Sequence, residues 1–120
     1  MKDVSQALVT ALENRDDETP PRALRCAACG FALTKDDEAV AVNGRHRRVV
    51  CNPAGMVFEI CCFRNAPGLA AHGPASAEFS WFSGYVWNIA LCRKCGAQVG
   101  WRFSGPDVFF ALIVGRFTAG

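Results

Sequence analysis

The sequence predicts an antiparallel all-β domain, and three observations lead to this prediction. Short segments rich in aromatic and β-branched residues alternate with close turn signals. No crossover helices are evident between them, so neighbouring strands are expected to pair antiparallel. The 120 residues, 51% hydrophobic and 20% charged, suit one packed domain rather than a disordered chain.

The N-terminal segment differs from the rest of the chain. Residues 1–19 contain a short stretch with helical spacing followed by acidic residues, and Pro20-Pro21 ends any helix there. A helix this short is marginal on its own. We therefore expect a flexible tail over residues 1–19 and a single domain over residues 20–120.

The β domain is expected to contain a hairpin near its start. Glu38–Val42 and Arg47–Cys51 flank Asn43-Gly44, the strongest short hairpin signal, and Asn52-Pro53-Ala54-Gly55 forms a second turn. Asn65–Ser76, with two prolines and two glycines, is expected to be a loop. Further strands are expected at Met56–Phe63, Tyr85–Leu91, Gln98–Phe103 and Val108–Val114, the last two joined by a turn at Pro106-Asp107.

Charge and hydropathy argue against two classes of partner. The net charge of +2 is too weak to indicate nucleic acid, and the short basic run Arg45–Arg48 is expected to be a solvated strand edge. The longest apolar stretch, Val108–Val114, is far shorter than the roughly 20 residues of a membrane span. We expect neither a nucleic-acid nor a membrane partner.

The cysteines indicate a reducing compartment. The N-terminus lacks the apolar core of a signal peptide, so we expect a cytoplasmic protein whose seven cysteines are metal ligands or free thiols rather than disulfides. Cys51, Cys61 and Cys62 are expected to be buried as small hydrophobic residues. His46 and His72 are expected to be solvated.

Four cysteines form two matched pairs, Cys26-Ala-Ala-Cys29-Gly30 and Cys92-Arg-Lys-Cys95-Gly96. A redox Cys-x-x-Cys is the alternative for a single pair, but two pairs supply the four sulfurs of a tetrahedral Zn²⁺ site. Because most of the domain separates the pairs and no fifth ligand is evident, we expect one structural zinc per chain. Arg25, Arg93 and Lys94 lie next to the ligands in sequence and can offset the thiolate charge.

The three tryptophans lie close together in sequence. Trp101 and Phe103 point to one face of a strand, and Gly84 can bend the chain so that Trp81 and Trp87 face each other. These rings either fill the core, which is the commoner role, or form a cage for a small flat or cationic group. Their spacing alone leaves both alternatives open.

A family resemblance rests on these same motifs. Phe79–Trp87, the second cysteine pair and Gly100–Phe103 resemble the thalidomide-binding (CULT) domain of the cereblon family, as do Cys51–Gly55 and the first cysteine pair. The resemblance covers nearly the whole chain after the tail. It implies a stand-alone bacterial member, with no counterpart of the helical region that joins cereblon to a ubiquitin-ligase scaffold.

The resemblance also implies a fold and a ligand. The fold is a β-tent of two antiparallel sheets pinned by zinc, and the ligand is a glutarimide, hydantoin or uracil-like ring, or a peptide with a cyclised imide end. Backbone groups of Phe79 and Trp81 would read the imide edge. Many members have histidine at the Phe79 position, where the imidazole can add a polar contact that phenylalanine cannot make. The implied ligand residues are Asn52, Pro53, Phe79, Ser80, Trp81, Trp87, Trp101 and Phe103.

Two other functions compete with imide binding. An enzyme like methionine sulfoxide reductase B would need a nucleophilic cysteine late in the chain, and none follows Cys95. Imide hydrolysis would need a base, and only Glu78 lies beside the expected cage. We therefore expect no enzymatic activity. A zinc-dependent protein-interaction module would leave the tryptophans in the core.

Overall fold

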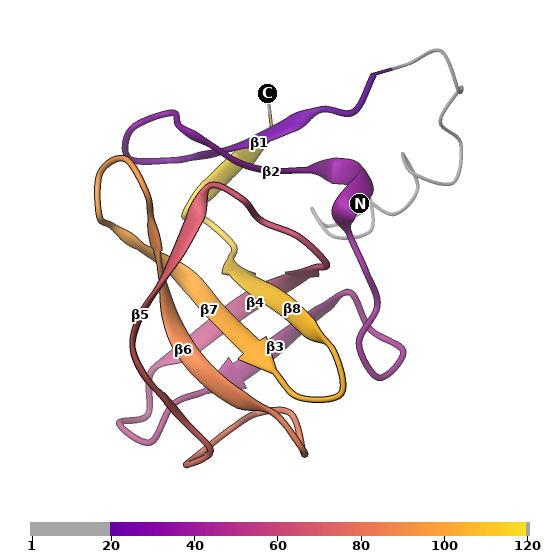
Figure 1. Cartoon of the computed structure of the whole chain (residues 1–120), viewed down its shortest axis with the longest axis vertical. Helices are drawn as coiled ribbons and strands as arrows, with labels where there is room; N and C mark the ends of the chain where they lie inside the picture. Colours follow the sequence, from indigo (N-terminus) through magenta and orange to yellow (C-terminus); the bar gives the residue numbers. More distant parts are fainter. Residues whose placement is uncertain (1–19, 120) are drawn as a thin grey trace.

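The computed structural model describes residues 20–119, and nearly all of their regular structure is β (Figure 1). The tail expected over residues 1–19 lies outside the described residues. The elements are β1 (Ala23–Cys26), β2 (Ala32–Lys35), the 3-10 turn η1 (Asp36–Glu38), β3 (Arg47–Cys51), β4 (Val57–Phe63), β5 (Leu69–Ser76), β6 (Val86–Cys92), β7 (Gln98–Ser104), β8 (Val108–Ile113) and β9 (Phe117–Ala119).

The strands form two antiparallel sheets, as the family resemblance implies. The small sheet has the order β2-β1-β9 and the large one the order β3-β4-β8-β7-β6-β5. Figure 1 shows the small sheet across one end of the large, strongly twisted sheet. Within residues 20–119, no helix is long and apolar enough to cross a membrane.

Both faces of the large sheet are buried at its central strands, which explains the nearly continuous apolar runs in β4 and β8. Along β4, Cys61 and Phe63 point into a core shared with the small sheet, whereas Ile60 and Cys62 point into a second, aromatic core. This alternation is the two-residue period of a strand. The aromatic core is filled by the rings of Phe82, Trp101, Phe103 and Phe109 together with Val50, Ile60, Cys62, Ala111 and Ile113.

Two expected elements are wrong. Leu69–Ser76, expected to be loop, forms the edge strand β5, whose pairing with β6 shifts register between His72 and Ser76. An edge strand tolerates Gly73 and Pro74 because one side needs no hydrogen bonds. Glu38–Val42, expected to be a strand, is the end of η1 followed by isolated bridges only. The turn itself is present, since Asn43 and Gly44 both have positive φ.

The expected solvated edge at Arg45–Arg48 is also wrong for two of its residues. His46 is 7% exposed and packs edge-on against Phe63, with its Nδ1 3.1 Å from the Val40 carbonyl. The Arg48 guanidinium lies 4.7 Å from the centre of the Phe82 ring and donates to the Val42 carbonyl. His46 immediately precedes β3 and Arg48 lies in it, so the two side chains point away from the side that Arg47 takes.

The unpaired cysteines divide between interior and surface. Cys61 and Cys62 are fully buried, as expected, whereas Cys51 is exposed, contrary to expectation. Cys51 lies at the end of β3, on the face opposite Val50, where neither core reaches it.

Candidate functional site

The cross-strand register of the large sheet brings the aromatic residues together. Trp87 on β6 lies opposite Phe103 on β7, and Ile89 lies opposite Trp101. Directly opposed residues point to the same face of a sheet, so these four side chains form one apolar surface. The sheet therefore supplies two of the three indoles and the phenyl ring below them.

The third indole comes from the connection between β5 and β6. The Trp81 ring centre lies 4.7 Å from that of Trp101, nearly perpendicular to it, and 6.2 Å from that of Phe103. Its Nε1–H donates to the Cys51 carbonyl at 3.0 Å. This bond ties the connection to the end of β3 and leaves the faces of the indole, rather than its N–H, to line the space beside it.

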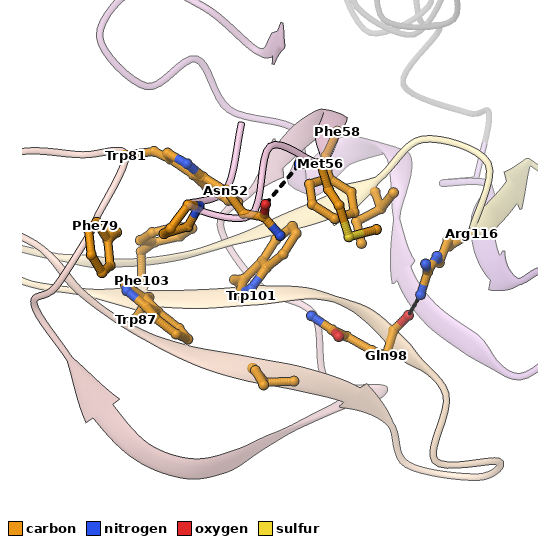
Figure 2. A pocket seen from close by; sticks show the side chains of 13 residues that line it. Asn52, Met56, Phe58, Phe79, Trp81, Trp87, Gln98, Trp101, Phe103 and Arg116 are labelled. Atoms are coloured by element: carbon orange, nitrogen blue, oxygen red, sulfur yellow. Dashed lines mark hydrogen bonds between the residues drawn. The ribbon is translucent and has the colours of Figure 1, made fainter. Parts of the chain in front are cut away.

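These rings border a cavity of about 450 Å³ (Figure 2). The cavity is lined by Asn52, Pro53, Met56, Phe58, Phe79, Trp81, Trp87, Ile89, Gln98, Trp101, Phe103, Ile113 and Arg116. Every ligand residue implied by the sequence is among them except Ser80. The Ser80 hydroxyl instead donates to the Phe82 carbonyl at 3.0 Å, so that its role is to shape the connection.

The aromatic side chains fill the core and line the cavity at the same time, so the two expected roles do not exclude each other. Trp101 is 8% exposed and Phe103 is 1% exposed, and both belong to the aromatic core while lining the cavity. Trp81 and Trp87 are half-buried at the cavity wall. The cavity is thus an open end of the core, walled by side chains that also stabilise the fold.

A strained backbone segment forms one rim of the cavity. Phe79 has a φ of +58°, a left-handed conformation that bulky residues rarely adopt, and its side chain is 69% exposed. The neighbouring Glu78 carbonyl accepts from Trp87 Nε1–H at 2.8 Å. Among residues 20–119, no hydrogen bond engages the backbone N–H or C=O of Phe79 or Trp81. The rim therefore presents free backbone donors and acceptors beside aromatic walls.

The opposite rim is a turn closed by its own side chain. Asn52 Oδ1 accepts from the Met56 N–H at 2.9 Å, and the Asn52 N–H donates to the Met56 carbonyl at 2.9 Å. Gly55 supplies the positive φ that this turn needs. The turn holds Asn52 and Pro53 at the cavity edge, with the Asn52 amide nitrogen left to reach a ligand.

The four cysteines of the two pairs meet at one point. The sulfurs of Cys26, Cys29, Cys92 and Cys95 all lie within 4.8 Å of one another, with Cys26–Cys95 at 3.8 Å and Cys29–Cys92 at 3.7 Å. A tetrahedron with metal–sulfur bonds of about 2.3 Å has sulfur–sulfur edges of about 3.8 Å. The cluster therefore fits a tetrahedral metal ion, and its spacing is far too long for disulfides.

Both pairs adopt the same local fold. The N–H of Cys26 donates to the Phe31 carbonyl and that of Gly30 to the Cys26 carbonyl, both at 2.8 Å. The same two hydrogen bonds recur at the second pair, around Cys92. Gly96, like Gly30, has positive φ. Glycine is needed there because an L side chain would strain the turn that points both sulfurs inward.

The electrostatics of the cluster also suit a cation. The Phe31 backbone lowers the pKa of Cys29, but burial and the three neighbouring thiols raise it to about 11. Burial raises the pKa of Cys92, but the backbone N–H groups of Cys95 and Lys94 lower it to about 7. The protein thus favours the thiolate form of Cys92 and disfavours that of Cys29, and a bound cation would favour the thiolate form of both.

Comparisons with known proteins agree with the family resemblance of the motifs. No family model matches the chain. Curated relatives named "Protein cereblon" from Drosophila simulans and Drosophila melanogaster are 35% identical in an alignment 97 residues long, which covers 72% of this chain and 16% of theirs. The cereblon of Gallus gallus is 45% identical in an alignment 67 residues long, which covers 51% of this chain and 15% of its own length.

Over this region the chain is homologous to proteins named cereblon, which is consistent with a cereblon-like domain. The resemblance predicted from its motifs is thereby confirmed. The aligned part spans only about one sixth of the length of the cereblon relatives, so what the whole of a cereblon does is not carried over by this match.

The cavity also contains residues that sequence reasoning missed. Met56 and Phe58 lie just before and at the start of β4, Ile113 at the end of β8, and Gln98 at the start of β7. Ile89 on β6 and Arg116, in the turn between β8 and β9, complete this group. Strand alternation could have placed Phe58 on the face of Ile60, but nothing in the sequence signals that Arg116 reaches the same cavity.

Proposed function

We propose that this domain binds cyclic imides in its aromatic cavity and that a structural Zn²⁺ occupies the four-cysteine site. The observation that carries the proposal is the joining of three indoles and Phe103 around one cavity whose rim bears unengaged backbone groups. Zinc is inferred because four thiolates in tetrahedral array are its characteristic structural site. The similarity of the chain to cereblon supports both inferences.

The chemistry of the cavity matches that of a cyclic imide. An imide ring is small and flat, with one N–H between two carbonyls. The faces of Trp81, Trp87 and Trp101 can enclose the apolar faces of such a ring, and Phe103 can close the floor. The free backbone groups of Phe79 and Trp81 can pair with the N–H and a carbonyl of the imide.

The side chain of Phe79 adds no polar contact to this scheme. It is 69% exposed at the rim, and its ring can only cover the ligand. Selectivity for the imide edge therefore rests on the main chain, whose position is fixed by the Glu78–Trp87 hydrogen bond.

A non-catalytic role agrees with the lining. None of the residues that line the cavity is a cysteine, serine, histidine or acid that could act as nucleophile or base. Glu78, the carboxylate nearest in sequence, is exposed on the rim connection. The domain is thus proposed as a binding module that holds its ligand unchanged.

Indole fluorescence tests the proposal directly. Zinc-loaded protein is titrated with glutarimide and, as the matched control, with N-methylglutarimide. Glutarimide should change the emission saturably, because two of the three indoles are half-exposed in the cavity. Methylation should weaken binding roughly 10- to 100-fold, since it removes a donor and leaves a buried acceptor unpaired. Equal affinities would refute the imide reading, and no fluorescence change with folded protein would favour a protein-interaction module.

A further inference from the structure

The cavity is longer than the aromatic cage. Figure 2 shows Arg116 and Gln98 at the end of the cavity away from Phe79 and Trp87, with Trp101 between. We call this region, lined by Met56, Phe58, Gln98 and Arg116, the arginine end. At about 450 Å³ the whole cavity is of the size that takes drug-like ligands, so a single imide ring in the cage leaves the arginine end unfilled.

Arg116 is held firmly at its end of the cavity. Its N–H donates to the Ile113 carbonyl at 3.0 Å, and its own carbonyl accepts from the Ala27 N–H at 3.0 Å. Its side chain is fixed as well, because Nη1 donates to the Gln98 carbonyl at 2.8 Å. A guanidinium carries five N–H donors, so this bond orients the group while leaving others for a ligand.

The charge of the arginine end is not paired with a carboxylate in the described protein. Arg116 is the one charged residue among those lining the cavity. Within residues 20–119 no carboxylate forms an ion pair with it, and the pair recorded there is between Arg47 and Glu59 on the β3–β4 hairpin. A cavity with aromatic walls and one oriented guanidinium favours a ligand that is apolar at one end and anionic at the other.

We propose that the arginine end is a subsite for an anionic substituent, so that the preferred ligands are cyclic imides bearing a carboxylate. This inference rests on the proposed imide binding in the cage. The middle of the cage lies between Trp101 and Phe103 on β7, and Gln98 lies four residues before that point. At about 3.3 Å per residue the two ends are roughly 13 Å apart, a span that a short acyl chain and the arginine side chain bridge together.

A series of acylated 3-aminoglutarimides tests the subsite. The acyl groups are succinyl, glutaryl and adipoyl, and each acid is compared with its terminal primary amide, which has the same shape without the charge. Affinities are measured by calorimetry at low salt. For at least one chain length the wild type should bind the acid about three- to tenfold tighter than the amide, as expected for a partly exposed charge-assisted hydrogen bond. The preference should shrink at high salt.

Two variants assign the preference to Arg116. In Arg116→Gln, which keeps a donor for the Gln98 carbonyl, the acid-to-amide ratio should fall to about one. In Arg102→Gln the ratio should stay as in the wild type. Arg102 is a matched control because its guanidinium also donates to a neighbouring oxygen, that of the Ser104 hydroxyl, but lies outside this cavity.

The outcomes separate this inference from the proposed function. If glutarimide itself does not bind the wild type, imide binding is refuted, and the subsite proposal that rests on it is refuted too. If glutarimide binds but acids and amides bind alike at every chain length, the subsite alone is refuted. A preference for acids that survives in Arg116→Gln also refutes it, because the charge would then act from elsewhere.

Discussion

Replacing Trp101 with alanine separates the two roles that the structure gives this side chain. Removal of a buried tryptophan typically costs about 3 to 5 kcal/mol of unfolding free energy. Trp101 is 8% exposed and packs edge-on against Trp81 and Phe58, with ring centres at 4.7 and 5.2 Å. Because part of the indole borders the cavity, fewer contacts are lost than in a closed core. We therefore expect a loss of about 3 kcal/mol.

The same substitution should weaken ligand binding. One aromatic wall contributes apolar burial and ring contact of about 1 to 3 kcal/mol, and its loss also admits water to the polar edge of the ligand. The affinity for glutarimide should fall at least about 30-fold, which corresponds to roughly 2 kcal/mol. The stability loss should lower the melting temperature of a domain of this size by about 15 °C.

Trp87→Ala is the matched comparison. Trp87 lines the same cavity but is half-buried, and the polar contact it makes is with the Glu78 carbonyl. It should lose affinity to a similar extent at a stability cost of only about 1 to 2 kcal/mol. Thermal denaturation with zinc present and calorimetric titration measure both quantities. The double role would be refuted if Trp101→Ala kept its affinity for glutarimide, or if it cost less stability than Trp87→Ala.

Three further perturbations test other parts of the structure. Cys92→Ser should release the metal and lower stability by several kcal/mol, whereas Cys51→Ser, outside the cluster, should keep the metal. Metal analysis and urea unfolding measure these effects, and metal retained in Cys92→Ser would contradict the site. Burial and Arg47 lower the pKa of His46, so the folded state binds fewer protons than the unfolded one, and stability should fall as pH drops below about 6.5. This slope should be shallower in His46→Gln, and identical slopes would exclude His46 as its source. Gly100→Ala would place Cβ 1.9 Å from the Ala111 carbonyl oxygen and should separate β7 from β8; an unfolding midpoint like that of the wild type would contradict this packing.

The sequence by itself determined the features that depend on local spacing. The metal ligands could be predicted because each Cys-x-x-Cys-Gly pair builds its turn from hydrogen bonds within about six residues. The strands β3, β4, β7 and β8 could be predicted from their aromatic and β-branched composition, and the Asn43-Gly44 turn from its preference for positive φ.

Tertiary packing decided the features on which local signals are weak or conflict. Gly73 and Pro74 predict a loop, yet β5 forms because β6 offers it an open sheet edge. His46 and Arg48 are polar in sequence, yet the inward face of β3 buries them against Phe63 and Phe82. Their surroundings come from strands distant along the chain, which no local window contains.

The cavity shows the same division most clearly. The sequence indicated the cage residues through their resemblance to a family motif, since their spacing alone left both core and cage open. The arginine end joins the start of β4, the start of β7 and the turn after β8, which are adjacent only because the strand order of the large sheet places β4, β8 and β7 side by side. Only the tertiary structure could decide that Arg116 faces the same cavity as the indoles, because the exposure and neighbours of a side chain depend on long-range strand pairing rather than on its position in the sequence.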